Sequence, residues 1–133
     1  MLEEFISIYK EYDIPLDFLN DYLIEAAYDG SFELVIFLLE ETEVKKNHDD
    51  NMPLIHAANK NNIEILNELL KYKEVNPTAK KSSAIYFAFK NNNEEAIEIL
   101  WKIPEVRESA SKDRPKIHNI LKIKFLKNNI EGF

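Results

Sequence analysis

The sequence contains no cysteine, and only two glycines and five prolines among 133 residues. The absence of cysteine excludes disulfides, thiolate metal sites and cysteine nucleophiles. The scarcity of turn-forming residues argues against a fold of many β-strands, which needs frequent glycine-containing hairpins. The chain starts with acidic residues, and no run approaches the roughly 20 apolar residues that span a bilayer. We therefore expect a cytoplasmic protein with no secretory signal and no membrane contact.

Hydrophobic residues make up 45% of the chain and aromatic residues 11%, which is enough to form a folded core. A length of 133 residues fits a single domain. The chain is rich in Leu, Ile, Glu, Lys and Asn. This composition favours helices joined by Asn-rich turns, so we predict an all-α fold.

The chain repeats itself with a period of 31 residues. Segments 33–39, 64–70 and 95–101 align without gaps, and so do two sets of single positions. These sets are the alanines 26, 57 and 88 and the valines 44, 75 and 106. Equal spacing over three units predicts a solenoid, in which each unit buries its apolar face only by stacking on its neighbours.

Each unit carries two short helical patterns. The second pattern has apolar residues at positions i, i+1, i+4 and i+5, which places them on one side of a helix. Between the two patterns lie Gly30, Asn61 and Asn92, which share one register. Glycine and asparagine tolerate the left-handed backbone that ends many helices. The sequence therefore predicts a helix–turn–helix unit with a left-handed residue at each turn.

Residues 52–58 read Met-Pro-Leu-Ile-His-Ala-Ala, and residues 61–70 read Asn-Asn-Ile-Glu-Ile-Leu-Asn-Glu-Leu-Leu. This unit resembles the ankyrin repeat, whose signature is Thr-Pro-Leu-His-x-Ala-Ala, a glycine turn and x-Glu-Val-Val-x-x-Leu-Leu. The resemblance covers residues 17–106. It implies a single ankyrin repeat domain over 1–133, with a cap helix (1–16), three repeats (17–47, 48–78, 79–109) and a C-terminal cap (110–133).

Three details depart from or extend the family pattern. The period is two residues shorter than usual, so we expect short turns in place of the hairpin fingers between repeats. Phe89 stands where alanine is usual, which predicts a displaced or locally repacked third repeat. In the cap helix we expect Phe5, Ile6, Ile8 and Tyr9 to form the buried side.

The resemblance implies a protein–protein interaction module that binds a partner on the concave face formed by the first helices. It places the contact residues around the paired alanines, with Tyr28 and Phe87 as aromatic anchors. Two alternatives stay open: His56 as a partly buried helix residue, and Phe87 as a packing residue against the next repeat. The predicted partner-binding residues are Glu25, Tyr28, Asp29, His56, Asn59, Lys60, Phe87, Lys90 and Asn91.

Charge is unevenly distributed. Residues 1–50 carry a net charge of −11 and residues 51–133 a net charge of +4, within a total of −7. The acidic half suggests an alternative function, an immunity-type protein that neutralises a basic toxin or nuclease. The basic C-terminal segment is interpreted as a solubilising cap. We expect no nucleic-acid binding, because an acidic protein repels the phosphate backbone.

No catalytic or phosphate-binding motif occurs in the sequence. His48, Asp49 and Asp50 are potential metal ligands, but adjacent residues rarely converge on one ion, so we interpret them as a solvated turn. We therefore expect a monomeric non-enzyme that has no cofactor and no small-molecule substrate. The segments ending at Val75 and Val106 are similar to repeats of ankyrin proteins from intracellular bacteria, which suggests a host-directed effector.

Overall fold

The computed structural model describes residues 2–128, and this part of the chain consists of helices and turns without a β-strand. The helices are α1 (Leu2–Glu11), α2 (Leu16–Asp29), α3 (Phe32–Glu41), α4 (His48–Asn59), α5 (Ile63–Leu70), α6 (Ala79–Lys90), α7 (Glu94–Trp101), α8 (Pro104–Asp113) and α9 (Pro115–Asn128).

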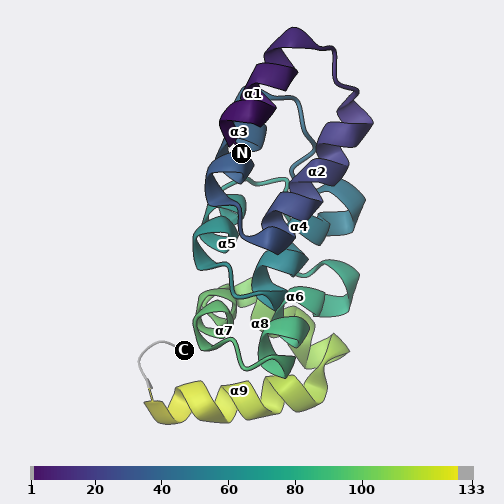
Figure 1. Ribbon diagram of the computed structural model, residues 1–133. Coiled ribbons are helices and arrows are strands. Elements are labelled where there is room, and N and C mark those ends of the chain that lie inside the picture. The colour runs from purple at the N-terminus through teal and green to yellow at the C-terminus, as the bar shows by residue number, and fades with distance from the viewer. Residues whose placement is uncertain (1, 129–133) are drawn as a thin grey trace.

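The helices are arranged in two columns (Figure 1). One column contains α2, α4, α6 and α8, and the other contains α3, α5 and α7, while each pair α2–α3, α4–α5 and α6–α7 packs as a hairpin. The predicted all-α solenoid of helix–turn–helix units is confirmed. We call the exposed side of α2, α4 and α6 the first-helix face.

The turn inside each hairpin contains the left-handed residue that the sequence predicts. The φ angles of Gly30, Asn61 and Asn92 are 79°, 57° and 56°. A β-carbon added at Gly30 would lie 3.0 Å from the side-chain oxygen of Asn62, so glycine avoids crowding there and adopts the left-handed angle without strain.

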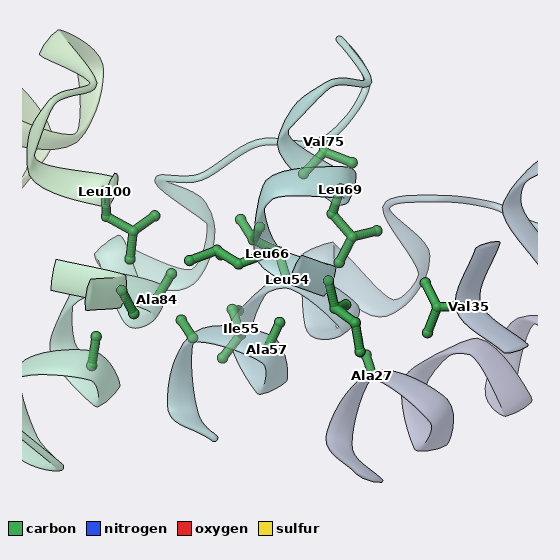
Figure 2. Packing of buried hydrophobic residues seen from close by; sticks show 14 of the residues in the cluster. Ala27, Val35, Leu54, Ile55, Ala57, Leu66, Leu69, Val75, Ala84 and Leu100 are labelled. Atoms are coloured by element: carbon green, nitrogen blue, oxygen red, sulfur yellow. The ribbon is translucent and has the colours of Figure 1, made fainter. Parts of the chain in front are cut away.

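One continuous core runs through the stack (Figure 2). Small residues of the first column, such as Ala27 and Ala57, face larger residues of the second column, such as Leu66 and Leu69, and all four are fully buried. The small side chains let the columns approach closely. Phe89 is half-buried against this core, and α6 still packs on α4 as α4 packs on α2.

Asparagine side chains join each hairpin to the preceding one. The side-chain amide of Asn62 donates a hydrogen bond to the carbonyl oxygen of Ala27 over 2.7 Å. Thirty-one residues later, the amide of Asn93 donates to the carbonyl oxygen of Ala58 over 2.9 Å. These bonds satisfy carbonyls at the ends of α2 and α4, which have no partner within their own helix.

Short turns connect the hairpins, as expected from the short period. The side-chain oxygen of the buried Asn20 accepts a hydrogen bond from the backbone N–H of Lys45 over 2.8 Å, and that of Asn51 accepts one from Asn76 over 2.7 Å. Three consecutive residues with left-handed backbone follow each turn, at 49–51 and at 80–82. The regular right-handed parts of α4 and α6 therefore begin only after these residues.

The first helix, α1, covers the end of the second column. Its buried Phe5 lies edge-on to Phe37 of α3, with ring centroids 6.0 Å apart. The prediction that Ile8 is buried is wrong, because 49% of its surface is exposed. No first-column helix precedes α2 in the described part of the chain, so the side of α1 that carries Ile8 has nothing to pack against.

The last pair, α8 and α9, departs from the period. α8 starts at Pro104, directly after α7, and packs on α6 as the next member of the first column. The boundary predicted between residues 109 and 110 falls inside this helix. α9 lies across the end of the stack (Figure 1), where Phe125 stacks on the buried Trp101 with centroids 6.4 Å apart.

Candidate functional site

Most of the predicted contact residues lie on the first-helix face and are accessible. Six of the nine are exposed, and three are half-buried. The exposed ones are Glu25, Tyr28, Asp29, Lys60, Lys90 and Asn91, and the half-buried ones are His56, Asn59 and Phe87. The face therefore offers side chains from three successive hairpins for contact.

Tyr28, His56 and Lys60 form one group on this face, which we call the Tyr28 cluster. Tyr28 is 44% exposed, and the His56 ring meets its ring edge-on with centroids 5.2 Å apart. The Lys60 ammonium lies 4.7 Å from the centre of the Tyr28 ring. A cation at this distance is attracted to the ring, typically by about 0.5–1 kcal/mol at an exposed site. The aromatic ring is therefore held in place by its neighbours.

His56 is the least accessible member of the Tyr28 cluster. Its Nδ1 atom is buried and has no hydrogen-bond partner among the described residues. Burial lowers the pKa of the imidazole from its usual value of 6.5, and the Asp49 carboxylate raises it by a smaller amount. The neutral form is therefore favoured, and the contact with Tyr28 fits the interpretation of His56 as a partly buried helix residue.

A second group on the same face consists of Tyr86, Phe87, Lys90 and Arg114, and we call it the Tyr86 cluster. The Tyr86 and Phe87 rings lie 5.1 Å apart. The Arg114 guanidinium is 4.3 Å from the centre of the Tyr86 ring, and the Lys90 ammonium is 5.9 Å from it. Two cations and two aromatic rings are thus brought together from α6 and the α8–α9 turn.

Asn59 and Asn91 have structural contacts of their own. The side-chain amide of Asn91 donates hydrogen bonds to the carbonyl oxygen of Asn59, over 3.2 Å, and to its side-chain oxygen. Asn93 donates to the same carbonyl oxygen over 2.8 Å. Asn59 and Asn91 thus link successive hairpins. A change at either one affects the geometry of the face as well as its chemistry.

The sequence analysis missed Tyr86 and Arg114. Tyr86 shares its register with Ile24 and Ile55, and a tyrosine among isoleucines was a signal that this position differs in the third unit. Arg114 carried no such signal. It comes close to Tyr86 only because α8 packs on α6, and its Nε donates a 2.9 Å hydrogen bond to the carbonyl oxygen of Lys81.

His48 binds a carboxylate of the neighbouring hairpin. Its Nε2 lies 2.9 Å from a carboxylate oxygen of Asp21. Over residues 2–128, no group of three or more His, Asp or Glu side chains could hold a metal ion.

None of the helices from α1 to α9 combines the length and the apolar character that crossing a bilayer requires.

Comparison with known proteins gives one match. A family model described as ankyrin repeats in three copies matches residues 23–109, more than half of the chain. No curated protein and no solved structure gives a significant match. Ankyrin repeats are generally protein–protein interaction modules and are typically non-enzymatic. Together with the stacked helical hairpins, the match shows that this chain belongs to the ankyrin repeat family.

Proposed function

We propose that the protein binds a partner protein through the first-helix face, with the Tyr28 and Tyr86 clusters as the principal contacts. The observation that carries this proposal is the exposed Tyr28 ring held between His56 and Lys60. Tyrosine and arginine are enriched among residues that dominate binding energy. A ring that already packs against its neighbours loses less conformational freedom on binding, which favours affinity.

The mechanism follows from the rigidity of the stack. The face is built on helices that share one core and are joined by side-chain hydrogen bonds. Such a surface holds or masks a partner without changing its own shape. We therefore propose a scaffolding or blocking role.

The test compares two double variants of the full chain as bait in a pull-down, followed by affinity measurement. Tyr28→Ala with Lys60→Glu disrupts the Tyr28 cluster. The control, Tyr12→Ala with Lys71→Glu, makes the same changes at exposed residues that directly follow α1 and α5. We expect the first variant to lose about 30-fold in affinity for the captured partner, and the control to bind like wild type. Equal binding by both variants contradicts this site.

A second candidate function is neutralisation of a basic toxin or nuclease. The observation that favours it is a row of exposed carboxylates at a spacing of four residues along α2: Asp17, Asp21, Glu25 and Asp29. Carboxylates four apart lie on the same side of a helix. Affinity that falls steeply with added salt supports this function, because the contact between opposite charges is screened. An interface centred on the Tyr28 ring would lose little affinity when salt is added.

A further inference from the structure

The exposed large hydrophobic side chains gather at the two ends of the stack. Over the described residues there are eight of them, and Tyr28 is the one that lies away from both ends. Four are at the N-terminal end and three are on α9. The four are Ile8, Tyr12, Leu16 and Phe18, and the three are Ile120, Ile123 and Leu126. A solvated end of a solenoid is normally polar, so this distribution calls for a covering partner.

The N-terminal end contains an apolar cleft between α1 and α2. The cleft has a volume of about 450 Å³ and is lined by Phe5, Ile8, Ile14, Phe18 and other side chains of these two helices and their connection. In each later hairpin, the corresponding side of the first helix is covered by the preceding member of the column. The cleft therefore lies where a further helix would continue the stack.

The C-terminal end presents a helix with a matching apolar stripe. Ile120, Ile123 and Leu126 are spaced three residues apart on α9, so they lie along one side of the helix. Ile123 is 67% exposed. Figure 1 shows α9 lying across the end of the stack, and all three side chains of the stripe are exposed.

The two ends carry opposite charge. The segment that forms the N-terminal cleft is rich in exposed carboxylates, with Lys10 as its one base, and Glu4 forms part of the cleft lining. The others near it in sequence are Glu3, Glu11, Asp13, Asp17 and Asp21. On α9, exposed Lys116 and Lys122 border the apolar stripe, and α9 contains no acidic residue. An apolar stripe flanked by lysines is thus complementary to an apolar cleft flanked by carboxylates.

We propose that α9 of one molecule docks into the α1–α2 cleft of a second copy of this chain, which joins the molecules head to tail. The apolar stripe supplies burial in the cleft, and the lysines meet the carboxylates at its rim. The contact is heterologous, because each molecule uses a different surface, and it leaves one end free for the next copy. This arrangement departs from the monomer that the sequence leads us to expect.

The charge pattern also predicts how salt affects the association. Each molecule has a net charge of −7, so two copies repel each other at long range. At the contact, however, the lysines and carboxylates would lie closer together than the screening length, which is about 8–10 Å near physiological ionic strength. Raising the salt concentration from about 0.15 M to about 0.5 M therefore weakens the association but leaves the apolar contribution.

The test uses two variants that each disable one end. Phe18→Lys places a positive charge in the cleft, and Ile123→Glu places a negative charge on the stripe, and both residues are more than half exposed. Sedimentation equilibrium of wild type is expected to give an average mass that rises with concentration above the 15.6 kDa of one chain. Each variant alone stays at the mass of one chain. An equal mixture of the two forms a dimer that cannot grow.

Three results would overturn the proposal. They are a wild type that stays at 15.6 kDa at every concentration, a single variant that still associates, and a mixture that does not form the dimer. Asn67→Lys is the control, because it adds the same positive charge at an exposed site on α5, away from both ends, and should associate like wild type. If circular dichroism shows that a variant is unfolded, Ile8→Lys and Ile120→Glu replace it at the same two surfaces.

Discussion

The three hairpins from α2 to α7 follow the 31-residue period, whereas the last pair, α8 and α9, does not. The difference is clearest at Val44, Val75 and Val106, which share one register and are all buried. Val44 and Val75 lie in turns after the second helices, but Val106 lies in α8. Valine at this register is thus buried in two different backbone conformations.

Two sequence differences accompany the change in backbone. Asn20 and Asn51 accept a hydrogen bond from a backbone N–H of the following turn. The next residue in this register is Ser82, whose shorter side chain instead meets the Ser109 hydroxyl over 2.6 Å. Pro104 then starts α8, since its fixed φ angle suits the first turn of a helix. We infer that the asparagine holds the turn open and that a helix forms where it is missing.

The largest predicted effect tests how the irregular pair is attached. Trp101 is fully buried and contacts both His118 and Phe125 of α9. Trp101→Ala removes this support, and we expect the free energy of unfolding to fall by about 3–5 kcal/mol. Leu70 occupies the same register as Trp101 in the regular part and is half-buried. We expect Leu70→Ala to lower the free energy of unfolding by less. Urea denaturation measures both, and an equal loss would show that α9 contributes little.

The next prediction tests the role of Asn51 in holding the turn. Asn51→Ser leaves the backbone N–H of Asn76 without its acceptor, so we expect the free energy of unfolding to fall by about 1–3 kcal/mol. Asn67→Ser makes the same change at an exposed site on α5 and should stay within about 0.5 kcal/mol of wild type. The free energy of unfolding from urea titration compares the two. Matching losses would refute the role given to Asn51.

The regular part of the fold follows from sequence because it depends on local and periodic signals. Gly30, Asn61 and Asn92 have the predicted left-handed angles, and the repeated alanines lie in the core. The helix α8 had no such signal, because its sequence is polar and its burial comes from packing of small residues on α6. Within the segment predicted as a C-terminal cap, the helix α9 begins at Pro115, and its position across the stack depends on α8.

In the candidate site, too, some contacts follow from the repeat period and others depend on how α8 packs. Tyr28, His56 and Lys60 come from adjacent repeats in known register, and the structure brings them together. Arg114 joins Tyr86 only through the packing of the irregular pair, which no spacing in the sequence predicts. Contacts within the periodic part were therefore predictable, and contacts across its boundary were not.

The smallest predicted effect distinguishes the two regions by pH. His56, in the regular part, has a pKa lowered by burial, so the unfolded chain takes up a proton near pH 6.5 before the folded protein does. Stability should therefore fall as the pH drops below 6.5, until it passes the lower pKa of the folded state. In the variant His56→Gln this contribution is absent, while His118 in the last pair is kept. Urea denaturation of both proteins from about pH 8 to about pH 5 measures the difference, and parallel curves would mean that burial does not affect His56.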